Sequence, residues 1–275
     1  PEIGAMKLGS RLVPAYSGSA TSGGYDPQDP YIERNPAYDE EESGGSVKGD
    51  QVVTDRHGRL YTLDEILLGT PAGGLGRGIT SIEWPSAYNV GSTFVDAVGT
   101  QITARVFKSA EMKAVTDDER FFAENPALSA QIQGICPYGW HVANVQDFYD
   151  MLCAAAAAKG VTPNPLSAMI GKWSVPDVLR SAEGWSAAPT RHAAADAFGF
   201  DFFPQGRRLF KSGYQYYASR GEMFICHPGG LSSGVYQCWR INALTNNAAD
   251  LTVSTTYNIG DCSASFRCVK NYENF

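Results

Sequence analysis

Apolar residues recur at intervals of three and four along residues 144–159, which predicts a helix. Phe148, a leucine and two alanines share one side of it, so that side is apolar and closely approachable. Asn144 can cap the first turn while Asp147 reaches back to its amide, and Gly160 favours the left-handed conformation that ends a helix. The pattern therefore predicts a well-delimited helix that lies on a sheet.

Two shorter helices are predicted on either side of it. Thr116, followed three residues later by an acidic residue, can cap one that ends before Pro126. Ser174 can cap the other, over residues 175–180, in the same way. Beyond Ser181 the helical spacing gives way to short apolar runs.

Alternating or β-branched runs predict short strands in the rest of the folded region. They cover residues 52–61 (a hairpin about His57 and Gly58), 101–106, 198–203, 214–219, 235–241, 251–254 and 265–270. The connections between the later strands, including 220–230, are predicted as long loops. Helices followed by a separate run of strands predict an α+β fold.

The first fifty residues differ from the rest of the chain. An apolar arm occupies residues 1–16, and then Gly, Ser, Pro and acidic residues dominate, including the run 39–42. Such a composition is typical of an extended connector. We therefore expect residues 1–50 to be an arm and connector and residues 51–275 to form the domain.

Charge and motifs exclude several classes of partner. The chain has 22 basic and 29 acidic residues, a formal net charge of −7, and so offers no field that attracts nucleic acid or anionic lipid. No run approaches the ~18 apolar residues of a membrane span, and the start at Pro1 predicts a processed form that has lost a signal peptide or lipid anchor. The histidines do not stand at zinc-ligand spacing, so we expect no metal and no cofactor.

All six cysteines lie in the second half of the chain, and none forms a Cys-x-x-Cys pair. Disulfides in an oxidising compartment explain them better than reduced core thiols, although spacing alone does not give the connectivity. We favour Cys136 with Cys268, which would join the entry of the domain to its last strand. Cys238 with Cys262 is the second candidate.

Three sequence blocks stand in order along the folded region. The first is Cys-Pro-Tyr-Gly-Trp-His at 136–141, the second is Leu-Arg-Ser at 179–181 with Gly-Trp at 184–185 and the run 199–208, and the third is Phe-Arg-Cys-Val-Lys at 266–270. Together they resemble the Fibrobacter succinogenes major paralogous domain, which is common in surface and secreted proteins of anaerobic Gram-negative bacteria. The resemblance implies a C-type-lectin-like fold with paired terminal strands, two flanking helices and a long-loop β region that forms the binding face.

Rigid aromatic rings and short hydrogen-bonding side chains, which suit binding faces, are concentrated in this β region. The residues expected to contact a ligand are Tyr214, Tyr216, Arg220, Met223, His227, Tyr236, Arg240, Asn242, Asn246, Asn247, Tyr257 and Asn258. Strand alternation places Tyr236, Cys238, Arg240 and Asn242 on one face, which we expect to be exposed.

These features predict a non-enzymatic recognition or adhesion domain, secreted or displayed as a lipoprotein on the outer surface of a Gram-negative bacterium. Its partner would be a protein or a glycan. The calcium-binding motifs of C-type lectins do not occur. The segment 229–270, rich in Asn, Tyr and Ser, is also consistent with the variable cassette of lectin-like proteins that diversity-generating retroelements diversify.

Two other functions stay open. The chain could be a structural subunit or tip component of a surface filament. Residues 138–158, followed by Phe-Arg-Cys at 266–268, also distantly resemble the formylglycine-generating sulfatase-modifying family, a resemblance that would make Cys262 and Cys268 the redox-active pair. His141, beside Trp140, is expected to be structural, with its ring hydrogen-bonded near the first strand.

Overall fold

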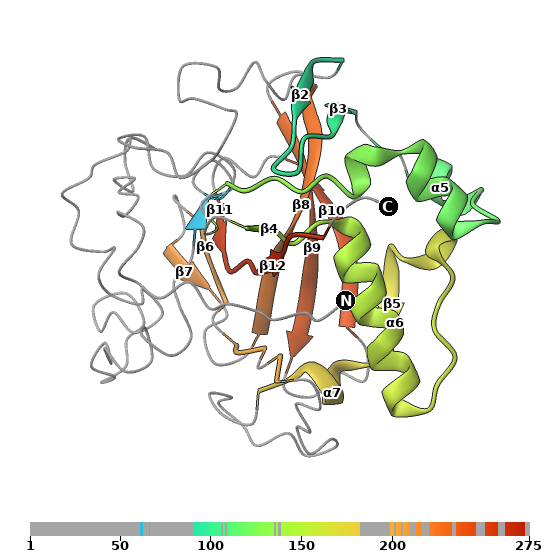
Figure 1. Ribbon diagram of the computed structural model, residues 1–275. Coiled ribbons are helices and arrows are strands. Elements are labelled where there is room, and N and C mark those ends of the chain that lie inside the picture. The colour runs from blue at the N-terminus through green and yellow to red at the C-terminus, as the bar shows by residue number, and fades with distance from the viewer. Residues whose placement is uncertain are drawn as a thin grey trace.

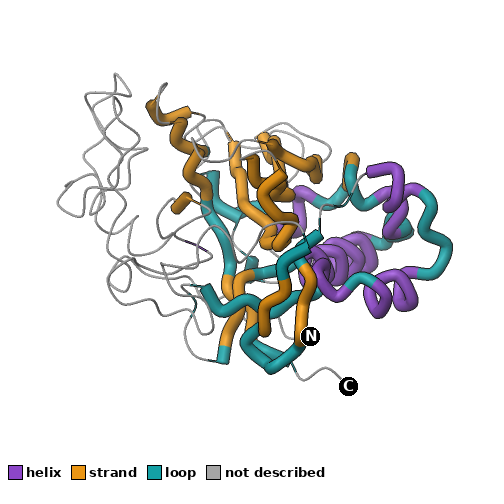
Figure 2. Tube along the Cα trace, turned by 90° about the horizontal axis from the view of Figure 1, so that it is seen from above, coloured by secondary structure: helices purple, strands orange, loops and turns teal. Residues whose placement is uncertain are grey.

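The helices of the protein gather beside its strands. The computed structural model describes residues 61–62, 66, 91–105, 107, 109–134, 136, 139–181, 199–200, 202–204, 206–209, 213–215, 220–232, 235–245, 251–257 and 262–272. Within them the longer helices lie on one side of the strands (Figures 1 and 2). The architecture is therefore α+β. The predicted arm and connector over 1–50 falls outside the described residues.

The main helix, α6 (Val145–Lys159), begins and ends where the sequence predicts. The Asn144 side-chain oxygen accepts a hydrogen bond from the Asp147 amide at 3.0 Å, and the Asp147 carboxylate accepts one from the Asn144 amide at 2.9 Å. Gly160 ends the helix at φ 75°. The start and stop signals at both ends of this helix are confirmed.

Replacing Gly160 with alanine should lower the free energy of unfolding by about 1 kcal/mol, because a β-carbon disfavours the left-handed conformation. No atom lies within 4 Å of the position that this β-carbon would take, so crowding adds nothing. Urea unfolding followed by circular dichroism measures the loss. Gly160→Asn should lose less, since asparagine tolerates this conformation better. Equal stability of parent and Gly160→Ala would contradict the prediction.

The shorter helices differ from prediction at their first residues. Helix α4 (Ser109–Lys113) precedes α5 (Asp118–Glu124), which is capped by Asp117 instead of Thr116, with the carboxylate accepting from the Arg120 amide at 3.0 Å. Helix α7 (Pro176–Leu179) starts after Val175, which makes no side-chain cap hydrogen bond, so the cap predicted at Ser174 is wrong. Two 3₁₀ turns, η4 (Pro126–Leu128) and η5 (Leu166–Ala168), complete this half.

The described strands form two four-stranded sheets and two pairs, and every pairing is antiparallel. One sheet has the order β1 (Tyr61–Thr62), β11 (Cys262–Ala264), β6 (Arg207–Leu209), β7 (Gly213–Gln215). The other, the main sheet, has the order β5 (Gly171–Trp173), β10 (Leu251–Tyr257), β9 (Val235–Thr245), β8 (Arg220–Ser232). The pairs are β2 (Thr93–Val95) with β3 (Gln101–Thr103) and β4 (Trp140–Val142) with β12 (Cys268–Lys270).

One predicted loop and one predicted strand are wrong. The predicted loop over 220–230 is part of β8, a strand of 13 residues. The predicted strand over 198–203 is not one, because its described residues make a single isolated bridge, between Phe202 and Arg180. Phe200, Phe202 and Phe203 are all buried, so this segment packs into the core instead of alternating between core and solvent.

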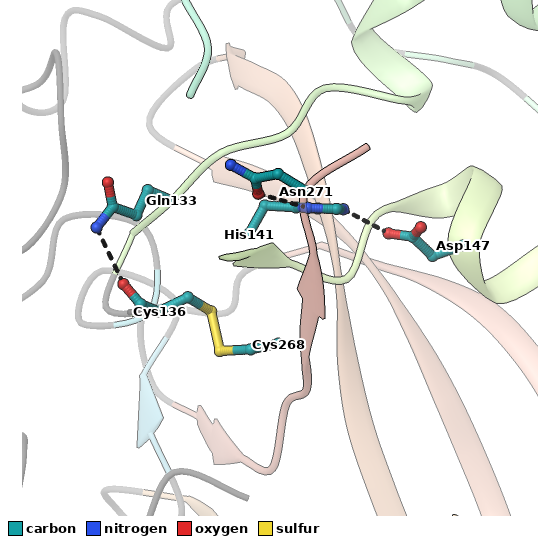
Figure 3. Close-up of a disulfide and its surroundings, with 6 residues drawn as sticks. All are labelled: Gln133, Cys136, His141, Asp147, Cys268 and Asn271. Atoms are coloured by element: carbon teal, nitrogen blue, oxygen red, sulfur yellow. Dashed lines mark hydrogen bonds and ion pairs between the residues drawn. A yellow bond between two sulfur atoms is a disulfide. The ribbon is translucent and has the colours of Figure 1, made fainter. Parts of the chain in front are cut away.

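A disulfide and a strand pair join the segment before α6 to the last described strand. Cys268 in β12 lies opposite Val142 in β4, and a disulfide links Cys268 to Cys136, with 5.8 Å between the Cα atoms (Figure 3). The predicted Cys136–Cys268 bridge is confirmed. Cys238 lies in β9 and Cys262 in β11, but their side chains are outside those described.

One face of the main sheet is part of the core. Trp173 of β5 is 1% exposed and meets the Tyr149 ring of α6 edge-on, with 6.2 Å between ring centroids. Its indole nitrogen donates to the Met169 carbonyl at 3.0 Å. The long helix thus reaches β5 through this ring contact, and it also packs against β8. None of the described helices has the length and apolarity to cross a bilayer.

Candidate functional site

The structure describes side chains for two of the twelve predicted ligand-binding residues, Arg220 and Met223. Arg220 is partly exposed, and its guanidinium lies 3.5 Å from the Glu222 carboxylate. Met223 is 0% exposed and belongs to the hydrophobic core. Because a buried side chain cannot contact a ligand at the surface, Met223 is removed from the candidate site.

The remaining predicted residues are placed by backbone alone or not at all. Tyr214 lies in β7, His227 in β8, Tyr257 in β10, and Tyr236, Arg240 and Asn242 lie in β9. Tyr216, Asn246, Asn247 and Asn258 fall outside the described residues. Where it is described, the predicted binding region is therefore mostly sheet, since β8 and β9 run through residues 220–230 and 236–245.

The register of the main sheet separates two rows of residues. Asn242 lies opposite Thr252, and Thr252 lies opposite Lys172, which is exposed. The neighbouring row contains Ile241 opposite Val253, which is 1% exposed. Successive residues of a strand point to opposite faces. The row of Asn242 and Thr252 therefore belongs to the face that is open at its β5 edge.

The same face is covered near β8. Arg240 of β9 lies opposite Ser254 of β10 and, on its other side, opposite Phe224 of β8. Phe224 is 1% exposed. We call the positions Lys172, Thr252, Ser254, Arg240 and Asn242 the sheet face.

A buried polar network lies beside the β4–β12 pair, near the Cys136–Cys268 disulfide (Figure 3). The two ring nitrogens of His141 lie 3.0 Å from an Asp147 carboxylate oxygen and 3.0 Å from the Asn271 side-chain oxygen. The Asn144 side-chain amide donates to the Tyr272 hydroxyl at 3.2 Å. Because His141 is 0% exposed, this network ties β4, α6 and the residues after β12 together and is closed to a substrate. The expected structural role of His141 is confirmed.

A cleft of about 650 Å³ opens beside this network, where the β2–β3 hairpin, α5, α6 and Tyr272 meet. Phe122, Tyr149 and Tyr272 supply aromatic walls, and the centroids of Phe122 and Tyr149 lie 6.2 Å apart. Polar lining comes from several elements and includes Asp96, Asp118, Glu119, Gln146 and Asp150. We call it the acidic cleft.

Two of the acidic side chains in the cleft have structural partners. The Asp96 carboxylate accepts hydrogen bonds from the amides of Val98 at 3.1 Å, Thr100 at 2.8 Å and Gln131 at 3.1 Å. Asp118 accepts a hydrogen bond from the Tyr149 hydroxyl at 2.6 Å. Burial and this bond to Asp118 raise the pKa of Tyr149.

Asp150 has a different environment. Burial, followed by the charge of Asp147, raises the pKa of its carboxyl group from 3.8 to about 6. Both effects penalise the ionised form. Across the cleft, burial also raises the pKa of Tyr272, so its hydroxyl stays protonated at neutral pH. The described residues contain no group of three or more His, Cys, Asp or Glu side chains that could hold a metal ion.

The sequence analysis missed the acidic cleft. Its residues lie in separate segments between positions 96 and 272, so no local motif joins them. One signal was present, because Gln146, Tyr149 and Asp150 stand at helical spacing and give α6 a polar side next to its apolar one. That side lines the cleft.

Two further findings bear on function. Cys268 is bonded to Cys136, so it is not the free thiol that the formylglycine-generating alternative requires. Comparisons of the chain with protein-family models, curated proteins and solved structures found no match.

Proposed function

We propose that this chain is a non-enzymatic recognition module with a C-type-lectin-like fold, secreted or held on the outer surface of a Gram-negative bacterium. The ordered blocks at 136–141, 179–208 and 266–270 support the family resemblance. The antiparallel pair β4–β12 and the Cys136–Cys268 bridge, which tie the segment before α6 to the last described strand, support the closure expected of this fold. A disulfide between them fits an oxidising compartment.

The observation that carries the proposal is the register of the main sheet. Arg240 and Asn242, two of the predicted contact residues, share a row with Thr252, while the alternate row contains the buried Val253. Polar positions on a sheet face that is open at its β5 edge, where Lys172 is exposed, form a rigid base for a ligand, which limits the entropy lost on binding. The ligand of this face is a protein or a glycan bound without calcium.

Replacing Arg240 and Asn242 together with alanine should weaken ligand binding by at least tenfold, because such polar contacts are removed without a change in the core row. Glycan arrays and panels of surface proteins, with and without a calcium chelator, identify the ligand, and titration calorimetry gives the affinities. The matched control removes two exposed basic side chains elsewhere, Lys113→Ala with Arg120→Ala.

Three outcomes separate the alternatives. Selective loss in the sheet-face variant, with the control unchanged, supports recognition at this face. Equal binding by both variants, or no binding by the parent, overturns it. Filament assembly by the parent chain in the absence of any ligand would favour the structural-subunit function.

A further inference from the structure

The acidic cleft has the size and wall chemistry of a site for a small group. Its volume of about 650 Å³ lies within the range of small-molecule sites, ~300–1,000 Å³. Phe122, Tyr149 and Tyr272 line it, so a ligand would meet aromatic rings as well as polar atoms. An apolar body with one charged end matches such walls.

The charge of the lining is of one sign. Asp118 and Glu119 come from α5 and Asp150 from α6, and none of the described residues that line the cleft is a Lys, Arg or His. The nearby Arg120 does not supply a counter-charge, because its guanidinium donates to the Glu124 carboxylate at 2.7 Å on the exposed side of α5. Carboxylates grouped around a hollow attract a cation and disfavour an anion.

We propose that the acidic cleft binds an organic cation, an alkylammonium or guanidinium group, with Asp150 and Glu119 as its charge partners and the aromatic rings against its apolar body. A cation beside aromatic rings gains from their quadrupole as well as from the carboxylates. This site is separate from the sheet face, so the inference does not rest on the proposed function.

Two sources could supply this chemistry, a free polyamine or the Lys and Arg side chains of a peptide. The probes are therefore spermidine and a short peptide that contains one arginine and one lysine, and glutarate serves as an anion that should not bind. Titration calorimetry of the intact oxidised protein at low salt compares them. Binding of spermidine supports a free amine as the source, and binding of the peptide alone supports a protein source.

Binding should also depend on pH. Among the described residues, the titratable groups near Asp150 are Asp147 and Cys153 on its own helix, Asp118 and Glu119 on α5, Asp96 on the hairpin, and Tyr272, while the charge of the chain's amino terminus lowers the pKa of Asp150. Because the pKa of Asp150 is about 6, its carboxylate is ionised above that pH and protonated below it. Cation affinity should therefore fall as the pH is lowered from 7.5 to 5, and binding near pH 6 should release protons.

Substitutions give the decisive test. Asp150→Asn and Glu119→Gln should each weaken cation binding at least fivefold, and Asp150→Asn should remove most of the pH dependence. Gln146→Lys, which puts a positive charge into the cleft, should abolish binding. Glu111→Gln removes one negative charge outside the cleft and should leave the affinity unchanged.

The Asp150→Asn variant is expected to stay folded. Because burial penalises the ionised carboxylate, Asp150→Asn should be at least as stable as the parent at pH 7. Parent-like affinity and pH dependence in Asp150→Asn would overturn the proposal, as would the absence of binding by both cationic probes at millimolar concentration. The Arg240→Ala, Asn242→Ala variant should bind the probes as the parent does, so failure here is distinct from failure at the sheet face.

Discussion

Replacing Cys136 and Cys268 together with alanine should lower the free energy of unfolding by about 4 kcal/mol. The bridge spans a sequence separation of 132 residues. Removing it frees a long closed loop in the unfolded chain, and the entropy of that chain rises accordingly. Urea unfolding of the parent and the double variant, followed by circular dichroism, measures the difference.

Substitution is preferable to reduction in this experiment, because a reductant would also act on any bridge among the other cysteines. Cys153 supplies the control, since it is a free, partly exposed cysteine of α6. Cys153→Ala should cost at most about 1 kcal/mol. Parent-like stability of the Cys136→Ala, Cys268→Ala variant would show that the bridge does not constrain the unfolded chain in solution.

Replacing Asp147 with alanine should lower the free energy of unfolding by about 3 kcal/mol. The Asp147 carboxylate is 4% exposed and serves both the Asn144 amide and the His141 ring. Its loss removes a helix cap and leaves two buried polar groups without this partner, and each effect costs about 1–2 kcal/mol. Urea unfolding at neutral pH gives the value.

Asp147→Asn should fall between the parent and Asp147→Ala, because an amide oxygen can still accept one of the two hydrogen bonds. Gln146→Ala is the control from the same turn of α6, and it should change stability by less than about 0.5 kcal/mol. A loss below about 1 kcal/mol in Asp147→Ala would mean that water replaces the carboxylate, and the network would then contribute little to stability.

The parts of the fold that local chemistry determines could be predicted from sequence. Helix α6 was found because Asn144, Asp147 and Gly160 act within one turn of its ends. The same reasoning failed at α5 by a single residue, because Thr116 and Asp117 are both acceptable N-cap residues and the sequence alone does not decide between them.

Strand β8 was missed for a physical reason. It contains Pro228, Gly229 and Gly230, which are typical of a turn. The strand accommodates them through register shifts between Ile225 and Gly229 and between Gly229 and Ser232. Bulges of this kind let a sheet absorb residues that would otherwise end a strand, so the composition of this segment predicted a loop.

In the candidate sites, too, local patterns predicted only what depends on neighbouring residues. Strand alternation was enough to put Arg240 and Asn242 in a different row from Ile241, since a period of two needs no tertiary knowledge. The burial of Met223 was not foreseen, because residues 220–230 were predicted as a loop; in the sheet Met223 lies opposite Ile241, in the buried row. The acidic cleft needed the full fold, as its lining comes from both ends of the described chain.

The position of the disulfide also has a mechanical consequence. Tension applied to the chain before Cys136 and after Cys268 would pass through the covalent bridge, whose Cα atoms lie 5.8 Å apart. The segment 137–267, with α6 and the main sheet, would be shielded from stretching, and roughly 450 Å of contour length would stay hidden. A module pulled at its ends, as a tethered surface protein is in flow, would keep the sheet face intact, whereas the acidic cleft, whose lining comes mostly from residues 96–129 and Tyr272, would open as the chain outside the bridge extends.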